Sequence, residues 1–258
     1  MGSHRFFIKQ VGQAPETIRF PGDIAHQIRN VLRLKPDDVV VVMDGEGRAF
    51  QVRLTVVAEQ ETIGKVIEIG EVRSAAPALL HLFFPLSKRD KVEWILQKGT
   101  EVGVNAFHPF ISERSLVQTP EMNDKRTTRW EAIIREAAEQ SGRGRLPDLA
   151  QAGSFENAIQ TAANANDLIL AAWVGEQQGG MQASLAHVKS RMGDQKTPPS
   201  IALFIGPEGG FSDREIDHLK AEGAHTVSLG ANILRMETAA IVFPALVLYE
   251  LGSSDPLK

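Results

Sequence analysis

The sequence predicts an α/β protein, in which a mostly parallel sheet with covered faces follows a smaller β-rich region at the N-terminus. From residue 79 onward, short apolar segments alternate with amphipathic segments of helical period, and this alternation is typical of parallel sheets. Residues 5–70 instead contain closely spaced strand candidates and a hairpin signal, Asp44-Gly-Glu-Gly47. A chain of 258 residues is long enough for two such domains.

The N-terminal region has the pattern of a small β-barrel interrupted by one helix. Strand candidates cover residues 5–9, 17–20, 39–44, 49–57 and 62–68. The helix covers residues 23–34, because apolar residues recur on one face at positions 24, 28, 31 and 32. Residues 72–78, which include a serine and a proline, form the predicted boundary. The sequence thus predicts one domain over residues 1–73 and another over residues 74–258.

The second region repeats a strand-then-helix pattern. Strand candidates cover residues 79–85, 105–111, 168–174, 201–205 and 226–229. Helix candidates cover residues 90–102, 124–141, 155–163, 182–192, 213–222 and 238–251. Ser154 is a candidate N-cap for the third of these helices, and Ser212 with Glu215 has the pattern of a capping box before the fifth. Residues 175–180 and 193–200 have the composition of surface loops.

Composition and charge exclude several classes of protein. No apolar run approaches the ~20 residues that span a bilayer and no export signal opens the chain, so we expect a cytoplasmic protein with no membrane segment. The absence of cysteine excludes disulfides and thiolate metal sites, and no His/Asp/Glu cluster suggests a metal. The net charge of −4 argues against a globally basic nucleic-acid binder, yet residues 86–145 carry 11 Lys and Arg against 9 Asp and Glu. A polyanion would therefore meet the first half of the chain, with mixed solvated faces as the alternative.

The most informative segments are two glycine-bearing loops that each follow an apolar strand. Residues 201–212 read IALFIGPEGGFS, and residues 229–238 read LGANILRMET. Two such strand–loop–helix units side by side place both loops at one edge of a sheet, where small ligands of open α/β folds bind. The glycines at 206, 209 and 210 allow a ligand to lie against the main chain. A plain tight turn and a phosphate-binding turn are alternatives, but Glu208 and the absence of a following lysine disfavour phosphate.

In this order, the two loops resemble those of the SPOUT class of RNA methyltransferases. The motifs GPEGGFSDREI and LGANILRMETA are similar to those of one branch, the RsmE family. Members of this family methylate N3 of uridine 1498 in 16S ribosomal RNA with S-adenosylmethionine. The resemblance extends to residues 91–103, Glu113-Arg-Ser115, residues 137–143 and residues 26–34, and so covers nearly the whole chain. It implies a PUA-like RNA-binding β-barrel domain, then a SPOUT domain that is trefoil-knotted from about residue 201. It also implies a homodimer whose partner is 16S ribosomal RNA, within the small ribosomal subunit.

The resemblance further implies that the two loops hold S-adenosylmethionine. Backbone groups of the first loop would hold the methionine and ribose parts, and apolar residues of the second would face the adenine ring. The cofactor-binding residues predicted in this way are Phe204, Ile205, Gly206, Pro207, Glu208, Gly209, Leu229, Gly230, Ile233, Leu234, Thr238 and Ala239.

Arg235 and Glu237 are the candidate catalytic residues. Arg235 lies in an apolar run where an unpaired charge would be costly, so it either pairs with a carboxylate such as Glu237 or contacts the uracil or the cofactor. N3 of uracil must lose a proton as it attacks a methyl group, and positive charge near O2 and O4 would stabilise the developing anion. Glu237 either takes up that proton or holds Arg235.

Basic and polar residues elsewhere are candidate RNA contacts. Spacings of three and four place His26, Arg29 and Arg33 on one helix face, which could follow a phosphate backbone; a solvated face is the alternative. The resemblance places Gln140 and Arg143 near the active site, although Arg143 could equally be a solvated charge at a helix C-terminus. The full set of predicted RNA-binding residues is Arg5, His26, Arg29, Arg33, Lys98, Arg114, Gln140 and Arg143.

The last helix, over residues 238–251, is apolar nearly all round. This pattern predicts burial on more than one side, against a partner subunit as well as its own domain. Pro244 in its middle would remove a backbone hydrogen bond and kink the helix. Two functional alternatives stay open: a SPOUT methyltransferase that acts on another RNA, such as the ribose of transfer RNA, and a non-catalytic RNA-binding assembly protein with the same fold.

Overall fold

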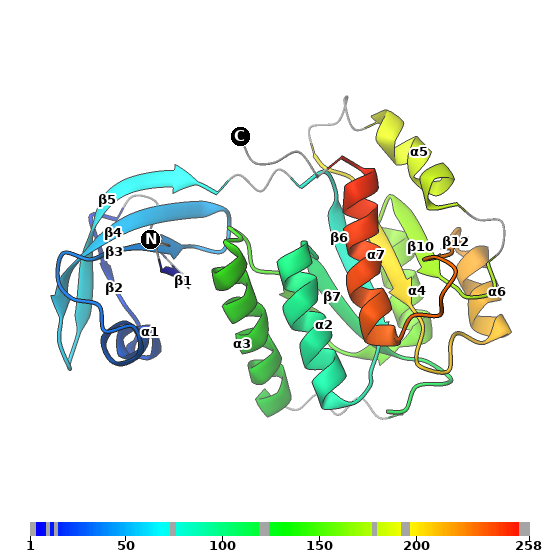
Figure 1. Ribbon diagram of the computed structural model, residues 1–258, viewed down its shortest axis with the longest axis horizontal. Coiled ribbons are helices and arrows are strands. Elements are labelled where there is room, and N and C mark those ends of the chain that lie inside the picture. The colour runs from blue at the N-terminus through cyan, green and yellow to red at the C-terminus, as the bar shows by residue number, and fades with distance from the viewer. Residues whose placement is uncertain are drawn as a thin grey trace. The chain divides into compact units, whose positions relative to one another are not determined.

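The computed structural model describes residues 4–8, 11–12, 15–72, 76–118, 124–176, 180–191 and 197–252. The chain forms two compact units (Figure 1): the first contains Met1–Ala75 with Arg135–Leu146, and the second contains Ala76–Ile134 with Pro147–Lys258. The sequence predicted one domain over residues 1–73 and another over residues 74–258. The compact units differ from this, because residues 135–146 belong to the first unit. The assignment of separate functions to the two predicted domains stays a prediction. Some predicted positions lie outside the described residues. These are the last residue of the strand predicted over 5–9, the last residue of the helix predicted over 182–192, residues 73–75 of the predicted boundary, and parts of the loops predicted over 175–180 and 193–200.

The first unit is built on a five-stranded sheet in the order β1-β3-β4-β5-β2. The strands are β1 (Arg5–Phe7), β2 (Thr17–Arg19), β3 (Val39–Met43), β4 (Arg48–Val57) and β5 (Thr62–Glu71). β1 runs parallel to β3, and the remaining pairs are antiparallel. Alternate side chains of β3 and β4, such as Val40 and Val52, are fully buried against Ile28 of a short helical segment. All five strands therefore lie where the period-two pattern predicts them.

The helical segment of the first unit ends earlier than the sequence predicts. Helix α1 (Gly22–His26) continues into a π-helical turn, η1 (Gln27–Val31), and Leu32 caps it. Arg33 lies beyond this end with a left-handed φ of 54°. The backbone N–H of Leu34 bonds back to the Ile28 carbonyl, a wide closure that stops the helix ahead of Pro36. The prediction that Arg33 shares a helix face with His26 and Arg29 is therefore wrong.

The second unit contains a seven-stranded sheet in which every pair is parallel. Its order is β12-β10-β11-β6-β7-β8, and β9 also pairs with β7. The strands are β6 (Leu79–Pro85), β7 (Ala106–Ile111), β8 (Asp148–Leu149), β9 (Gly153–Ser154), β10 (Leu168–Ala172), β11 (Ser200–Ile205) and β12 (His225–Val227). The predicted α/β class with a mostly parallel sheet is thereby confirmed. β8 and β9 were not predicted, because two residues are too few to show a period.

Among the described residues of this unit, six helices accompany the strands, at the places where the sequence predicts them. They are α2 (Arg89–Val102), α3 (Asp124–Ser141), α4 (Phe155–Ala165), α5 (Met181–Arg191), α6 (Asp213–Ala221) and α7 (Met236–Glu250). The side chain of Ser154 accepts a hydrogen bond from Asn157 N at the start of α4. Ser212 and Glu215 form the predicted capping box at the start of α6. Pro244 is buried within α7, and the helix continues through it.

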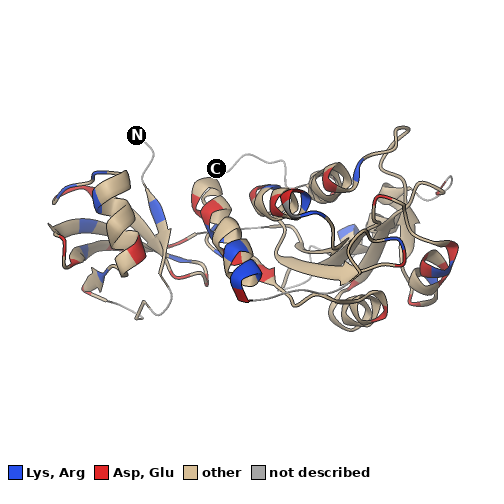
Figure 2. Ribbon diagram, turned by 90° about the horizontal axis from the view of Figure 1, so that it is seen from below, with Lys and Arg blue, Asp and Glu red and all other residues tan. Residues whose placement is uncertain are grey.

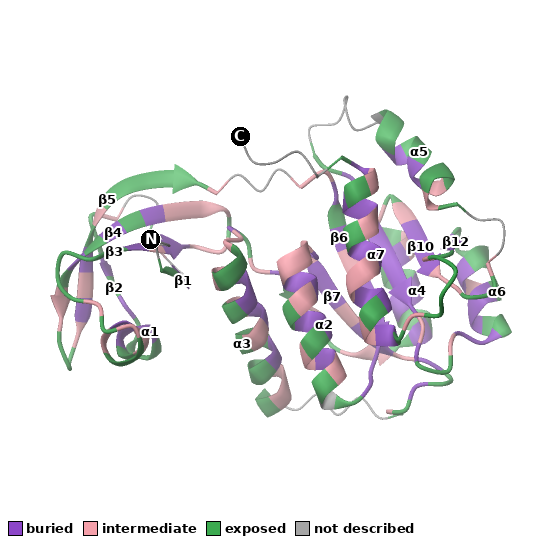
Figure 3. Ribbon diagram, viewed as in Figure 1, coloured by how far each residue is buried: buried purple, intermediate pink, exposed green. Residues whose placement is uncertain are grey.

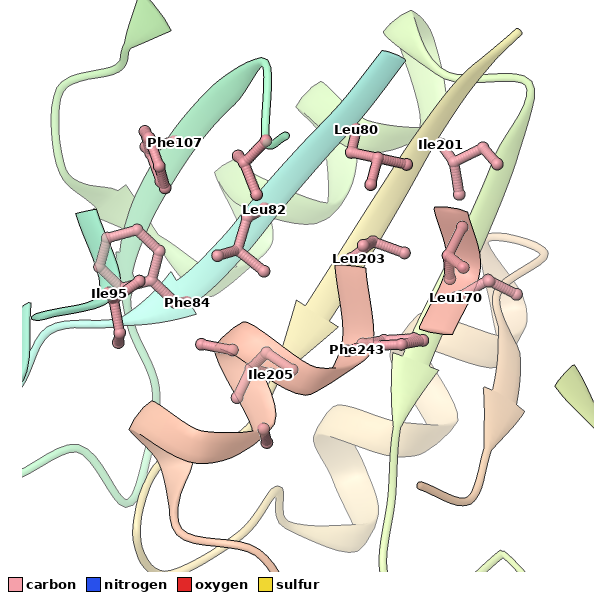
Figure 4. Packing of buried hydrophobic residues seen from close by; sticks show 14 of the residues in the cluster. Leu80, Leu82, Phe84, Ile95, Phe107, Leu170, Ile201, Leu203, Ile205 and Phe243 are labelled. Carbon is pink, nitrogen blue, oxygen red and sulfur yellow. The ribbon is translucent and has the colours of Figure 1, made fainter. Parts of the chain in front are cut away.

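Both faces of the parallel sheet are covered by separate cores (Figure 3). Alternate residues of one strand serve opposite faces, so Leu82 and Phe84 pack toward α2 and α7 while Phe83 packs toward α4 and α6. Figure 4 shows the first layer, with side chains of β6, β11 and Phe243 of α7. Phe204 belongs to the second layer, where its ring stacks on Phe83 with centroids 4.5 Å apart.

Two histidines extend this aromatic layer. His108 stacks on Phe83 with ring centroids 4.3 Å apart, and His81 lies 5.5 Å from His108. Burial, together with the neighbouring His81, lowers the pKa of His108 from 6.5 to about 4. Burial also lowers the pKa of His81, against the opposing charge of Asp148. The ring of His108 is therefore neutral at the pH at which free histidine begins to take up a proton.

We expect the second unit to lose stability as the pH falls from 6.5 toward 4. The unfolded chain binds the proton of His108 below pH 6.5 while the folded chain does not, so the free energy of unfolding drops in this window by at most roughly 3 kcal/mol. His108→Phe keeps the stack on Phe83 and should flatten the pH dependence in urea unfolding. The same change at His187, which is exposed on α5, should leave the dependence as it is; equal slopes for wild type and His108→Phe would contradict the assignment.

Among the described residues, no helix combines the length and apolar character that crossing a bilayer requires. In the same part of the chain, no group of three or more His, Cys, Asp or Glu side chains has the arrangement of a metal site. Figure 2 shows that basic and acidic residues are interspersed along the helices rather than segregated.

Candidate active site

The second unit contains a cavity of about 770 Å³ at the carboxyl ends of three parallel strands. Ala172 ends β10 and Ile205 ends β11, and Ser228 follows β12, so the cavity lies where open α/β sheets bind ligands. The residues that line it are Lys91, Arg114, Ala172, Trp173, Val174, Ile205, Gly206, Pro207, Glu208, Gly209, Gly210, Phe211, Asp213, Ser228, Leu229, Gly230, Ala231, Asn232, Ile233, Leu234, Arg235, Met236 and Ala239.

The loop between β11 and α6 forms one side of the cavity. Its backbone turns sharply, and glycines are needed at the turn. A Cβ added to Gly206 would lie 3.1 Å from the backbone nitrogen of Phe211, so a side chain there would require the loop to shift by a few tenths of an ångström. Gly210 has a φ of +70° and its N–H donates to the Pro207 carbonyl at 2.8 Å, which closes the turn. The loop thus presents main-chain groups at the cavity.

The second wall is the loop between β12 and α7. Gly230 has a φ of +122°, a conformation that side-chain-bearing residues rarely adopt, and its N–H donates to Ser228 Oγ at 3.3 Å. Ile233 on this loop is 79% exposed, and Val174 beyond β10 is 71% exposed. These exposed aliphatic side chains give the rim of the cavity an apolar surface that a ligand can cover.

A third loop, after β7, braces the first. The side chain of Glu215 accepts hydrogen bonds from the backbone N–H groups of Ser212 at 2.8 Å and of Glu113 at 3.1 Å. Nη1 of Arg114 donates to the carbonyl of Gly209 at 3.1 Å and to that of Phe211 at 3.4 Å. Arg114 therefore lines the cavity as a support of the glycine loop.

A group of hydrogen-bonded polar and charged side chains at the cavity comes from residues that are far apart in the chain. Oε1 of Glu208 accepts hydrogen bonds from Ser87 Oγ at 2.6 Å and from Lys91 Nζ at 2.8 Å. Burial alone would raise the pKa of Glu208, but the bonds from Lys91 and Ser87 outweigh it and leave the pKa below its ordinary value. The hydrogen bond to Glu208 in turn raises the pKa of Lys91. Both groups are therefore charged at neutral pH, so Glu208 is a weak base.

Arg235 is exposed at the N-cap of α7 and lines the cavity. Among the described residues it forms no salt bridge. Glu237 instead lies 3.5 Å from Lys91 Nζ and does not line the cavity. The suggested ion pair between Arg235 and Glu237 is therefore wrong. Its premise of a costly unpaired charge is wrong as well, because Arg235 is exposed to solvent.

Ten of the twelve predicted cofactor-binding residues line the cavity, and two do not. Phe204 is fully buried under the opposite face of the sheet, because strand alternation turns it away from Ile205. Thr238 is exposed on α7 outside the cavity. The sequence did not single out Lys91, Trp173, Val174, Asp213 or Asn232. Trp173 and Val174 were within reach of prediction, because they directly follow the end of a buried strand.

The predicted RNA-binding residues lie in different parts of the chain. Arg114 lines the cavity, and Lys98 on α2 bonds to Glu101 at 2.7 Å. Arg29 in the first unit donates to the Ala58 carbonyl at 2.8 Å. Burial lowers the pKa of Arg143 to about 10, which is still well above neutrality. The residues that belong to the first unit are Arg5, His26, Arg29, Arg33, Gln140 and Arg143.

Comparison with known protein families assigns both units. Residues 74–248 match the RNA methyltransferase domain, and residues 20–67 match the RNA methyltransferase PUA domain. The first match covers more than half of the chain. The chain belongs to the RNA methyltransferase family. It is an enzyme of that class, and the predicted PUA-like first domain is confirmed.

Individual relatives resemble this methyltransferase over most of its length. The ribosomal RNA small subunit methyltransferase E of Bacillus subtilis is 32% identical over 95% of this chain and 96% of its own. The protein of the same name from Synechocystis is 33% identical over 84% of this chain and 68% of its own. The crystal structure of a ribosomal RNA small subunit methyltransferase E from Neisseria gonorrhoeae, bound to S-adenosyl methionine, has a TM-score of 0.82 and 28% identity, over 96% of this chain and 98% of that one.

Proposed function

We propose that this protein transfers the methyl group of S-adenosylmethionine to N3 of a uridine in 16S ribosomal RNA, the position numbered 1498. One observation carries the proposal: two glycine loops and an arginine meet in one cavity at the carboxyl ends of the parallel strands. A volume of about 770 Å³ suits a cofactor together with part of a nucleotide. The names of the relatives support the choice of ribosomal RNA.

The residues of the cavity fit S-adenosylmethionine. Gly206 and Gly209 both line the open space, and neither has a side chain that could block a ligand from the main chain. The aliphatic rim at Ile233 and Leu234 would cover the adenine ring. When bound, S-adenosylmethionine supplies an electrophilic methyl group. A related structure that holds this cofactor supports the assignment.

Arg235 is the residue that we propose to act on the uracil. Its guanidinium is exposed at the cavity and engaged by no carboxylate among the described residues, so it is available to a developing anion on O2 or O4. Glu237 does not reach the cavity, and we propose that it acts through Lys91, as a positioning residue. Lys91 in turn holds Glu208 and the glycine loop in place.

The first domain, residues 1–73, is proposed to dock the RNA, and residues 74–258 to carry the chemistry. The match of residues 20–67 to the PUA domain of RNA methyltransferases supports this division. We further propose that the substrate belongs to the small ribosomal subunit in the cytoplasm, and that the segment from about residue 201 is threaded as a trefoil knot.

We also propose that two copies associate through α7. Met236, Phe243 and Val247 bury one side of this helix in the core, whereas Ala245 and Tyr249 lie exposed on the other (Figure 3). Half-buried Ile241 and Val242 extend this second side, so the helix presents a largely apolar surface that a partner subunit can cover.

Ala245→Glu is expected to convert the dimer into a monomer, because it buries a charge in the proposed interface. Sedimentation velocity measures the change, and Ala221→Glu at the exposed end of α6 is the control. If Ala245→Glu sediments as the wild type does, α7 is not the interface.

The proposed reaction is tested by mass spectrometry of ribosomal RNA from a strain that lacks this protein. The N3-methylated uridine should disappear from 16S ribosomal RNA and return when the gene is restored. If the mark stays and a methylated nucleoside is lost from transfer RNA instead, the substrate assignment fails. If no mark changes and the protein does not bind S-adenosylmethionine in calorimetry, it is a non-catalytic assembly protein.

A further inference from the structure

The first unit contains a second, smaller groove of about 380 Å³, to which neither glycine loop contributes a residue. Three elements form it: strand β1, the π-helical turn η1 and the last turns of α3. The residues that line it are His4, Arg5, Phe6, Gln27, Leu32, Glu136, Glu139 and Gln140. Arg5 and Gln140 were predicted from the sequence as RNA contacts, and the fold brings them together although 135 positions separate them.

The walls of this groove are held in place by specific contacts. Oε1 of Glu139 accepts the backbone N–H of Phe7 at 2.9 Å, which ties α3 to β1. Phe7 packs with Ala138 and Met43 in a small buried cluster beneath. Gly142 has a φ of +76°, and a Cβ there would lie 3.2 Å from the guanidinium of Arg5. The Arg5 head group is therefore placed over the C-terminal end of α3, which favours a positive charge.

The groups that line the groove select the chemistry of its ligand. Glu136 and Glu139 supply acceptors and disfavour a phosphate through like charge. Arg5, Gln27 and Gln140 supply donors. A flat group that offers both donors and acceptors on its edge fits this set, and unstacked RNA bases are read in this way. Half-buried Leu32 supplies an apolar surface for the face of such a base.

Guanine is the base that satisfies both kinds of group. Its N1–H and N2–H₂ are adjacent donors that suit one carboxylate, and its O6 and N7 are the acceptors that arginine binds as a pair. Adenine has no acceptor at position 6, and uracil and cytosine have no N7. Burial raises the pKa of Glu139, although the N–H of Phe7 opposes the effect, so this carboxyl gains from additional donors.

We propose that this groove binds an unpaired guanine of the RNA substrate, at a position other than the methylated uridine. The proposal rests on the proposed function, because it requires that the chain binds single-stranded RNA. Its role is to set which stretch of RNA enters the enzyme. Contacts to a base outside the reacting nucleotide supply sequence selectivity without touching the methyl transfer.

The test uses the full-length protein and fluorescence anisotropy with short single-stranded RNA. Two oligonucleotides differ only at one central base, guanosine or inosine, and inosine lacks the N2 amino group. The wild type should bind the guanosine oligonucleotide about tenfold more tightly, the effect of one lost bidentate pair. Glu136→Gln and Glu139→Gln are each measured. Both substitutions keep a carbonyl acceptor, so the new amide in Glu139→Gln can still accept the N–H of Phe7.

At least one of the two variants should bring the preference for guanosine close to parity, with an unchanged melting temperature. Glu131→Gln removes the same charge from α3 outside the groove and should keep the preference. If the wild type binds RNA but prefers neither oligonucleotide, or if both groove variants keep the preference, the inference is overturned while the proposed function stands. If the wild type binds neither oligonucleotide, and the N3-methylated uridine also stays in 16S ribosomal RNA after deletion of the gene, then both the proposed function and this inference fail.

Discussion

Gly209→Val is expected to abolish measurable binding of S-adenosylmethionine while the protein stays folded. The added Cβ would lie 3.2 Å from Cβ of Arg114, so the neighbouring loop must give by a few tenths of an ångström, and the methyl groups beyond it would lie at the cavity wall. A ligand that can no longer approach the main chain loses about two hydrogen bonds of about 1.5 kcal/mol each. Affinity should therefore fall by at least about a hundredfold in isothermal calorimetry.

A matched variant separates this local effect from a general effect of replacing glycine. Gly70→Val lies on β5 of the first unit, where no atom is within 4 Å of the added Cβ, and it should bind the cofactor as the wild type does. Gly206→Val should disturb the loop more strongly, because its Cβ would lie 3.1 Å from the backbone nitrogen of Phe211. We expect this variant to have a lower melting temperature as well. Unchanged affinity in a folded Gly209→Val protein would remove the cofactor from this cavity.

Arg235→Ala is expected to slow methyl transfer on the order of 10²–10³-fold, the usual effect of removing a donor to a developing anion. Stability should change by no more than about 0.5 kcal/mol, because the side chain is exposed and no carboxylate among the described residues loses a partner. Single-turnover kinetics and the melting temperature of the same preparation measure both effects. Arg235→Lys should recover part of the rate of methyl transfer, because lysine restores the positive charge but cannot donate the paired hydrogen bonds of a planar guanidinium.

Arg214→Ala provides the control for the loss of an exposed arginine. Arg214 lies on α6 of the same unit and does not line the cavity, so its variant should turn over normally. A normal single-turnover rate for Arg235→Ala would show that Arg235 does not stabilise the reaction. The cavity would then rely on Lys91, whose charge is already engaged by Glu208 and Glu237.

Local signals account for what the sequence predicted well. The capping box at Ser212 and the cap at Ser154 involve residues three positions apart, and both occur as predicted. The order of strands and helices follows from periods of 2 and 3.6, which act over one element at a time. The two glycine loops were located because their composition is itself the requirement: Gly210 and Gly230 have positive φ.

The tertiary structure decided whatever depends on residues that are distant in sequence or on the direction of one side chain. Ser87 and Lys91 reach Glu208 across 121 and 117 positions, and no periodicity links them. The groove of the first unit required the end of α3 to pack against β1, which a linear division of the chain at residue 73 did not foresee. Phe204 and Ile205 are neighbours in sequence, yet they serve opposite faces of the sheet. The sequence by itself thus determined most of the longer elements, the caps at Ser154 and Ser212, and the two glycine loops that form the cavity. Only the fold decided which charges meet there, because pairing energies depend on distance in space and not on separation along the chain.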